Sequence, residues 1–292
     1  MNNIGTVMLE TKRLILRKIS LKDIPFAYKN WVADEEVTKF ITWKKHKDVG
    51  ETKDLLEFWI NKYKFKNTYR WIIELKEMGE PIGIIDVVSL DEKLNMAVIG
   101  YAIGKTWWNK GIVTEAFSRI IKFLFESVKL NRVEAIHMTS NIASGKVMEK
   151  CGLKYEGTNR QRLKNKEELV DVSIYGILAE DYFKGRKFKA IVDRPVGYVD
   201  DYKNVYPINY GFIPGIISGD GEEQDAYILT EDNKPLEEFT GELIAKIIRK
   251  DDVEEKWVLG EDNRIYSRDE IFEKTLFMEQ HFDSIIKIIK TP

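Results

Sequence analysis

The chain has 292 residues, 43% of them hydrophobic and 12% aromatic, which is enough for two domains that each bury a core. The net charge of −2 conceals two unlike parts, because residues 1–187 carry 33 Lys and Arg against 25 Asp and Glu, whereas residues 188–292 carry 13 against 23. A single cysteine excludes internal disulfides, three histidines argue against the usual zinc sites, and no apolar run has the length of a membrane span or the pattern of a signal peptide. We therefore expect a cytoplasmic protein with no membrane partner. A basic first part suits an anionic ligand and an acidic second part suits a metal or cation, although solvated surfaces explain the same charges.

Hydrophobic periodicity predicts the elements of the first part in chain order. They are a strand at 13–18, helices at 20–31 and 52–63, strands at 70–75, 82–90 and 96–103, a helix at 114–127, a strand at 133–138, a helix at 142–151, and strands at 153–156 and 172–178. This order, β-α-α-β-β-β-α-β-α-β-β, predicts an α/β domain with a mixed central sheet and flanking helices. The change in charge near residues 180–187 predicts a domain boundary there, with domains at 1–183 and 188–292.

The segment 107–116 connects the strand at 96–103 with the helix at 114–127 and has Gly111 at its centre. A strand-to-helix turn of this kind directs backbone N–H groups and a helix N-terminus at one point, which is an arrangement that binds phosphate. A side chain at position 111 would block the close approach of an anion to the backbone. An ordinary connecting loop is the alternative, and the turn alone does not decide between them.

Two further motifs accompany this turn. Gly100-Tyr101 lies near the end of a strand, and Asn141-Ile142-Ala143-Ser144 opens a helix that leads to Cys151-Gly152-Leu153. Together with the turn and the element order, these motifs resemble the GNAT N-acetyltransferases, with the ribosomal-protein N-terminal alanine acetyltransferases as the nearest branch. The resemblance covers residues 8–182 and implies that residues 1–183 form an acetyltransferase domain.

The resemblance implies acetyl-CoA as the cofactor. Its pyrophosphate would lie on the turn, its pantetheine arm along the end of the strand at 96–103, and an amine would attack the acetyl group directly. The implied cofactor-binding residues are Ala102, Ile103, Asn109, Lys110, Gly111, Ile112, Val113, Thr114 and Asn141. Asn109 stands where the family often has glycine or arginine, and Asn141 also suits the cap of the following helix.

Three catalytic residues are candidates. Ser144 resembles the hydroxyl that protonates the leaving thiolate, and Tyr175 resembles a tyrosine late in the family's sequence. Val98 stands where this branch often has a glutamate, so the base that deprotonates the amine is sought elsewhere. Asp86 and Glu74 are the carboxylates on predicted strands, and Asp86 lies in an otherwise apolar run, where a solvent-facing position is the alternative.

The acceptor is expected to enter between the N-terminal helices and the last two strands of the domain. The side chains that could shape this entrance are Trp31, Trp43, Tyr63, Arg160 and Arg162, although aromatic residues at such places more often pack in a core. A protein N-terminus, an aminoglycoside, a polyamine or another small amine all remain open as acceptors, as does a homodimer. Nucleic acid is not expected, because the basic residues are dispersed and an acidic domain follows.

The second part contains Tyr206-Pro207-Ile208-Asn209-Tyr210-Gly211-Phe212-Ile213-Pro214, followed closely by Asp220-Gly221-Glu222-Glu223-Gln224-Asp225. Carboxylates around Gly221 could converge on a divalent cation, or they are acidic turn residues in solvent. The two motifs resemble the family I soluble inorganic pyrophosphatases, and this resemblance implies a small β-barrel with flanking helices at 188–292.

This second resemblance implies Mg²⁺ ligands and a phosphate site. The implied metal ligands are Asp220, Glu222, Asp225 and Asp252, and the implied phosphate-site residues are Asp193, Tyr206, Tyr210 and Lys256. The segment between Gly197 and Tyr206 is too short for several cationic residues of the family, which would neutralise the substrate's phosphates. Three hypotheses follow: an acetyltransferase with an appended pyrophosphatase-like domain, a bifunctional enzyme that also hydrolyses phosphate compounds with Mg²⁺, and a scaffold that binds acetyl-CoA and phosphate without turnover.

Overall fold

The computed structural model describes residues 1–250, 252, 254–262 and 264–289, and they form two compact units. One unit comprises Asn3–Ala179 and the other starts at Glu180, a few residues before the predicted boundary. The second unit starts early because the aromatic ring of Phe183 packs at 5.3 Å from that of Trp257, inside the second core. Among the described residues, no helix is long and apolar enough to cross a membrane.

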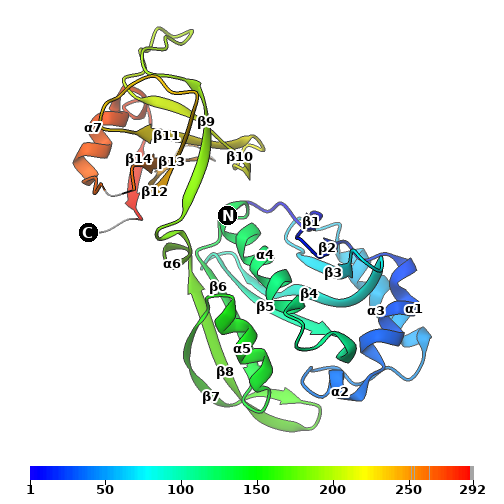
Figure 1. The fold of residues 1–292 in the computed structure, drawn as a ribbon. Coiled ribbons are helices and arrows are strands. Elements are labelled where there is room, and N and C mark those ends of the chain that lie inside the picture. The colour runs from blue at the N-terminus through cyan, green and yellow to red at the C-terminus, as the bar shows by residue number, and fades with distance from the viewer. Residues whose placement is uncertain (251, 253, 263, 290–292) are drawn as a thin grey trace. The chain divides into compact units, whose positions relative to one another are not determined.

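The first unit is built on one mixed sheet of eight strands in the order β1-β2-β3-β4-β5-β6-β8-β7 (Figure 1). Only β5 and β6 pair in parallel, and every other neighbouring pair is antiparallel. The strands are β1 (Leu9–Glu10), β2 (Leu14–Arg17), β3 (Arg70–Leu75), β4 (Glu80–Asp91), β5 (Met96–Ile103), β6 (Arg132–Met138), β7 (Lys154–Asn165) and β8 (Glu168–Leu178). The predicted mixed sheet is present, but β7 and β8 form a much longer hairpin than expected.

The helices differ most from expectation near the N-terminus. The helix predicted at 20–31 is three short segments, η1 (Leu21–Asp23), α1 (Ile24–Ala27) and the π-helical η2 (Tyr28–Val32), since Pro25 has no N–H to donate to the preceding turn. A further helix, α2 (Glu35–Thr38), was not predicted; Asp34 caps it. The helices α3 (Val49–Lys62), α4 (Ile112–Glu126) and α5 (Ile142–Lys150) are close to the predicted positions, and the short η3 (Lys105–Trp107) was not predicted.

Helices cover the two faces of this sheet differently. On one face, Trp31 and Leu56 from the N-terminal helices pack with Ile72 and Ile84 of β3 and β4. On the other face, the ring of Trp71 lies 5.9 Å from Phe123 of α4. Because side chains alternate along a strand, each face of β3 to β5 supplies its own core, and the strands are apolar on both sides.

The second unit is a closed five-stranded barrel, in which β9 pairs with β10, β10 with β11, β11 with β13, β13 with β12, and β12 with β9. A sixth strand, β14, extends β12, and α7 follows the barrel strands. The elements are α6 (Ala179–Phe183), β9 (Lys187–Arg194), β10 (Asn209–Ile217), β11 (Glu223–Leu229), β12 (Glu238–Arg249), β13 (Glu255–Gly260), α7 (Arg268–Glu279) and β14 (Ser284–Ile288). The expected small barrel is therefore present.

Candidate active site

The parallel strands β5 and β6 pair along only part of their length. Their register runs from Met96↔Arg132 to Ile99↔Ala135 and then stops, although β6 continues beside β8 as far as Met138↔Val172. The last residues of β5, including the predicted Ala102 and Ile103, therefore make no ladder with β6. The Ile103 carbonyl oxygen accepts from Trp108 Nε1 at 2.9 Å, and the backbone groups that have no partner on that side are available to a ligand that carries amides.

The loop after β5 leads directly into the N-terminus of α4. Gly111 is the residue before the helix and has a left-handed conformation with φ 70°, and Asn109 also has a positive φ of 58°. No side chain of the described residues caps α4. The first N–H groups of this helix, at Ile112 to Thr114, have no partner within the helix, which makes this end a site of partial positive charge.

An arginine from the other end of the domain holds this loop. The Arg13 guanidinium donates from Nη1 to the Lys110 carbonyl oxygen at 2.9 Å and from Nε to Glu115 Oε2 at 2.6 Å, while the Arg13 backbone N–H donates to Glu115 Oε1 at 2.9 Å. Burial alone would raise the pKa of Glu115, but hydrogen bonds from Thr11 and Arg13 outweigh it and lower that pKa. Our sequence reasoning missed Arg13, because nothing local links it to a loop about a hundred residues away.

Ser144 lies at the start of α5 and is hydrogen bonded to the half-buried Tyr101. The hydroxyl of Tyr101 lies 2.7 Å from Ser144 Oγ and 3.2 Å from the Ser144 carbonyl oxygen. Burial raises the pKa of Tyr101, so its phenol stays protonated. Asn141 is the N-cap of α5, and its side chain accepts a hydrogen bond from the Ser144 N–H at 3.4 Å. The predicted capping role of Asn141 is thus confirmed, and Tyr101 is a second hydroxyl at Ser144 that we did not predict.

Tyr175 approaches the same helix from β8. Its hydroxyl donates to Glu149 Oε1 at 3.2 Å, and burial together with the Glu149 charge raises the pKa of Tyr175. A Cβ at Gly145 would lie 3.4 Å from the Tyr175 hydroxyl and 2.8 Å from His137 Nε2. The structure therefore brings Ser144 and Tyr175 together on the α5 side of the sheet.

Asp86 lies on the opposite face of the sheet. It is 8% exposed, it pairs in register with Gly100, and its Oδ2 accepts from Arg70 Nε at 2.8 Å and Nη2 at 2.5 Å. Burial raises the pKa of Asp86, and the Arg70 guanidinium opposes that rise. The carboxylate is therefore not a solvent-facing residue. The other candidate, Glu74 of β3, accepts a hydrogen bond from Arg17 Nε at 2.6 Å.

The aromatic residues expected at the acceptor entrance are mostly core residues. Trp31 is fully buried, Trp43 packs edge-on against Trp59 at 6.4 Å, and the Tyr63 hydroxyl bonds the Ile19 N–H and the Arg70 carbonyl. Arg160 and Arg162 are exposed on β7.

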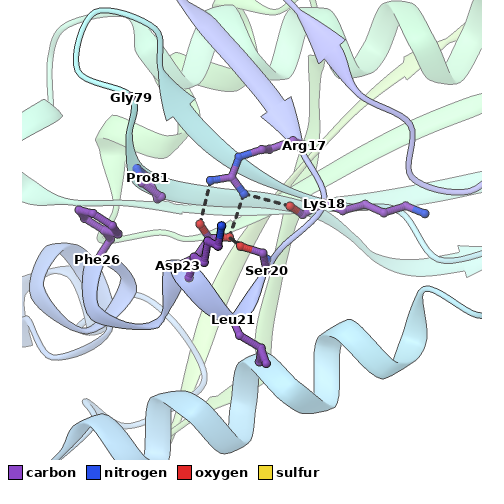
Figure 2. A pocket seen from close by; sticks show the side chains of 9 residues that line it. Arg17, Lys18, Ser20, Leu21, Asp23, Phe26, Gly79 and Pro81 are labelled. Carbon is purple, nitrogen blue, oxygen red and sulfur yellow. Dashed lines mark hydrogen bonds and ion pairs between the residues drawn. The ribbon is translucent and has the colours of Figure 1, made fainter.

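A surface pocket of about 650 Å³ lies at the start of the N-terminal helices (Figure 2). Figure 2 shows that Arg17 points at Asp23, with both guanidinium nitrogens of its fork bonded to the carboxylate at 2.8 and 2.9 Å. The pocket is lined by Phe26, Pro81 and neighbouring residues and includes none of the predicted site residues. We therefore assign it no part in the chemistry.

Comparison with known proteins agrees with this geometry. The profile of the acetyltransferase (GNAT) domain matches residues 13–154. The N-acetyltransferase p20 of Bacillus licheniformis is 34% identical over 175 residues, which span 60% of this chain and 97% of p20. The chain belongs to the GNAT acetyltransferases.

Two other relatives extend this comparison. The crystal structure of a GNAT-family acetyltransferase from Bacillus anthracis superimposes with a TM-score of 0.54 at 25% identity, over 60% of this chain and 99% of that one. The ribosomal protein uS5 alanine N-acetyltransferase of Escherichia coli is 27% identical over 88 residues, 30% of this chain and 45% of that protein. GNAT membership gives this chain an N-acetyltransferase domain with relatives among the ribosomal-protein acetyltransferases.

The predicted metal ligands of the second unit have other partners. Lys256, 5% exposed, bonds Asp225 and Glu254 with its ammonium, Asp252 lies 3.5 Å from Arg249, and the Glu222 N–H donates to Asp220 at 2.9 Å. Across the described part of the chain, no three His, Cys, Asp or Glu side chains are grouped so that they could hold a metal ion. Of the predicted ligands, Asp225 is paired with Lys256 and Asp252 with Arg249, so the described carboxylates do not fit a bound Mg²⁺.

The predicted phosphate residues are partly brought together. Tyr206 and Tyr210 are buried with rings 5.8 Å apart, and Arg194 Nη1 donates to the Tyr206 hydroxyl at 3.0 Å. The pKa of Tyr210 is raised well above its ordinary value by burial and by its neighbour Asp225. Asp193 is exposed at the end of β9. Tyr206 thus contacts Tyr210, and Tyr210 is linked to Lys256 through Asp225.

Proposed function

We propose that the first unit transfers the acetyl group of acetyl-CoA to a primary amine. The observation that supports this most is the uncapped N-terminus of α4, entered through a left-handed Gly111 beside the point where β5 and β6 diverge. Of the described atoms, a Cβ built at Gly111 would have only Arg13 Nη2 within 4 Å, at 3.7 Å, so the backbone there is open to an anion. Acetyl-CoA supplies an acetyl group activated as a thioester.

In this proposal, residues of the loop before α4 and of the end of β5 bind and orient acetyl-CoA. N–H groups from Asn109 to Thr114 hold the pyrophosphate, and Arg13 keeps the Lys110 carbonyl turned away from that charge by donating a hydrogen bond to it. The end of β5 that makes no ladder with β6, at Ala102 and Ile103, pairs with the pantetheine amides through the backbone groups that Trp108 leaves free. Asn141 orders the start of α5 by its cap.

Two groups handle protons on opposite faces of the sheet. Ser144, supported by the Tyr101 hydroxyl, donates a proton to the leaving sulfur, and the neutral Tyr101 can replace it across 2.7 Å. Asp86 takes the proton of the attacking amine on the side of the N-terminal helices, where burial raises its pKa against the opposing effect of Arg70. Tyr175, bonded to Glu149, orients α5 beneath Ser144.

Titration of the whole protein with acetyl-CoA, with and without Mg²⁺, tests this function. We expect micromolar binding that is lost in Gly111→Glu, because the new carboxylate fills and charges the phosphate site. Binding that is equal in the two proteins would overturn the proposal. Binding without turnover of any amine would instead favour the scaffold hypothesis.

For the second unit, the pyrophosphatase-like assignment stays a prediction that rests on its motifs and its five-stranded barrel. Pyrophosphate hydrolysis does not follow from this barrel, because two of the carboxylates expected to bind metal are paired with cations, Asp225 with Lys256 and Asp252 with Arg249. Phosphate release from pyrophosphate with Mg²⁺ that disappears in Asp225→Asn would establish the bifunctional alternative. No release would leave this unit as a binding or assembly module.

A further inference from the structure

Two segments distant in sequence meet beside the proposed transfer site. The Asn165 side-chain amide at the tip of the β7–β8 hairpin donates to the Lys39 carbonyl oxygen at 3.1 Å, after α2. Figure 1 shows the hairpin tip next to α2, past the end of β6. The segment at 160–166 and the segment at 39–47 thus form one surface, which we call the cationic mouth.

The cationic mouth is at the open ends of the diverging strands. The β7–β8 hairpin extends past Met138, the last residue of β6. There the Thr139 N–H donates to the Asp171 carbonyl oxygen at 3.1 Å, shortly before α5 begins. On the other side, Lys105, which follows β5, is ion-paired with Glu36 of α2. Both segments therefore border the place where an amine must reach the acetyl group on the side away from the pyrophosphate loop.

The positive charge of the first unit is concentrated in the cationic mouth. Residues 1–179 carry 30 Lys and Arg against 23 Asp and Glu, and eight of these cations lie in 39–47 and 160–166, which contain no carboxylate. The rest of residues 1–179 is close to neutral, with 22 cations against 23 anions. The eight side chains, all exposed, are those of Lys39, Lys44, Lys45, Lys47, Arg160, Arg162, Lys164 and Lys166.

Nearby carboxylates neutralise only part of this charge. Glu35 pairs with Lys45 at 2.9 Å, Glu167 lies 3.7 Å from Lys164, and Asp171 accepts the Gln161 N–H at 2.8 Å. Asp34 is used as the cap of α2. Six of the eight cations make no ion pair within the described residues. Asp48 and Glu51, at the start of α3, and Glu168, at the start of β8, are further carboxylates at the edge of the cationic mouth.

We propose that the acceptor is an acidic polypeptide whose N-terminal amine enters through the cationic mouth; this rests on the proposed acetyltransferase function. Like charges repel polyamines and aminoglycosides from this surface, whereas an extended chain with several carboxylates is attracted along it. The amine nitrogen attacks the acetyl carbon, the C–S bond breaks, the sulfur takes a proton, and the amine loses one.

Peptides that share their first three residues but continue with Glu, Gln or Lys test this proposal. Binding to the full chain with acetyl-CoA bound is measured by fluorescence anisotropy, and kcat/KM by thiol release. We expect the acidic peptide to bind about tenfold or more tightly than the Gln peptide, a preference that declines as ionic strength rises from about 0.05 M to about 0.5 M.

The variant Arg160→Gln/Arg162→Gln removes two exposed cations that make no ion pair in the described part of the chain, and Lys66→Gln/Lys93→Gln removes two exposed cations outside the cationic mouth. The first pair should abolish most of the acidic preference, and the second should leave it unchanged. Equal binding of acidic and Gln peptides, a preference for the Lys peptide, or tight oligonucleotide binding that competes with the acidic peptide would each overturn the proposal. If the unaltered protein did not bind acetyl-CoA, the proposed acetyltransferase function itself would be wrong.

Discussion

Replacement of Gly111 by alanine separates backbone strain from ligand binding. Alanine in the left-handed conformation at φ 70° costs about 1 kcal/mol of folding free energy, which lowers the Tm of a unit of this size by about 3 °C. No packing penalty adds to this, because among the described atoms the new Cβ meets only Arg13 Nη2, at 3.7 Å. The same Cβ stands where the anion approaches, and the loss of one charge-assisted hydrogen bond weakens acetyl-CoA binding about tenfold to a hundredfold.

Gly79→Ala is the matched control, because Gly79 has φ 61° in the β3–β4 turn and no described atom within 4 Å of its Cβ position. Both variants should lose similar stability in thermal unfolding, but only Gly111→Ala should lose affinity in calorimetric titration with acetyl-CoA. A Gly111→Ala protein that binds acetyl-CoA as tightly as Gly79→Ala would refute the assignment of the loop.

Three further predictions follow from named contacts. Arg13→Gln and Glu115→Gln should each raise the acetyl-CoA Kd several-fold, because both remove the same restraint on the loop. The double variant should have no weaker affinity than either single variant, and additive losses of affinity in titration would contradict this. Tyr101→Phe should lower kcat more than it changes KM, and an unchanged kcat would exclude the proton relay to Ser144. In the second unit, burial alone would raise the pKa of Glu279, but hydrogen bonds from Arg249, Ser284 and Tyr227 lower it. The free energy of unfolding should therefore be highest above about pH 4.5 and should decline as the pH falls through the lowered pKa. Urea unfolding at several pH values measures this decline, and a Glu279→Gln protein with the same pH dependence would disprove the cause.

Much of the first unit could be predicted because its signals are local. The glycine turn, the strand pattern at 96–103 and the cap at Asn141 each depend on a few consecutive residues, and the predicted elements lie within a few residues of the observed ones. The hairpin was underestimated because β7 is exposed along most of its length and therefore lacks the alternation that marks a half-buried strand. The division of the N-terminal helix into 3-10, α and π segments was missed because the apolar pattern does not distinguish these hydrogen-bonding types.

The features of the site are likewise of two kinds, those encoded by short stretches of sequence and those set by tertiary contacts. The sequence determined the GNAT resemblance, the phosphate-binding turn and the change of charge between the two units, because composition and short motifs carry these features. Only the tertiary structure decided that Arg13 holds the loop, that Tyr101 supports Ser144, that Asp86 lies on the opposite face, and that Lys256 pairs with Asp225. These pairs are separated by up to about a hundred residues, so their contacts depend on which strands are neighbours and which face each side chain takes, and the order of strands in a sheet is not a local property of the chain.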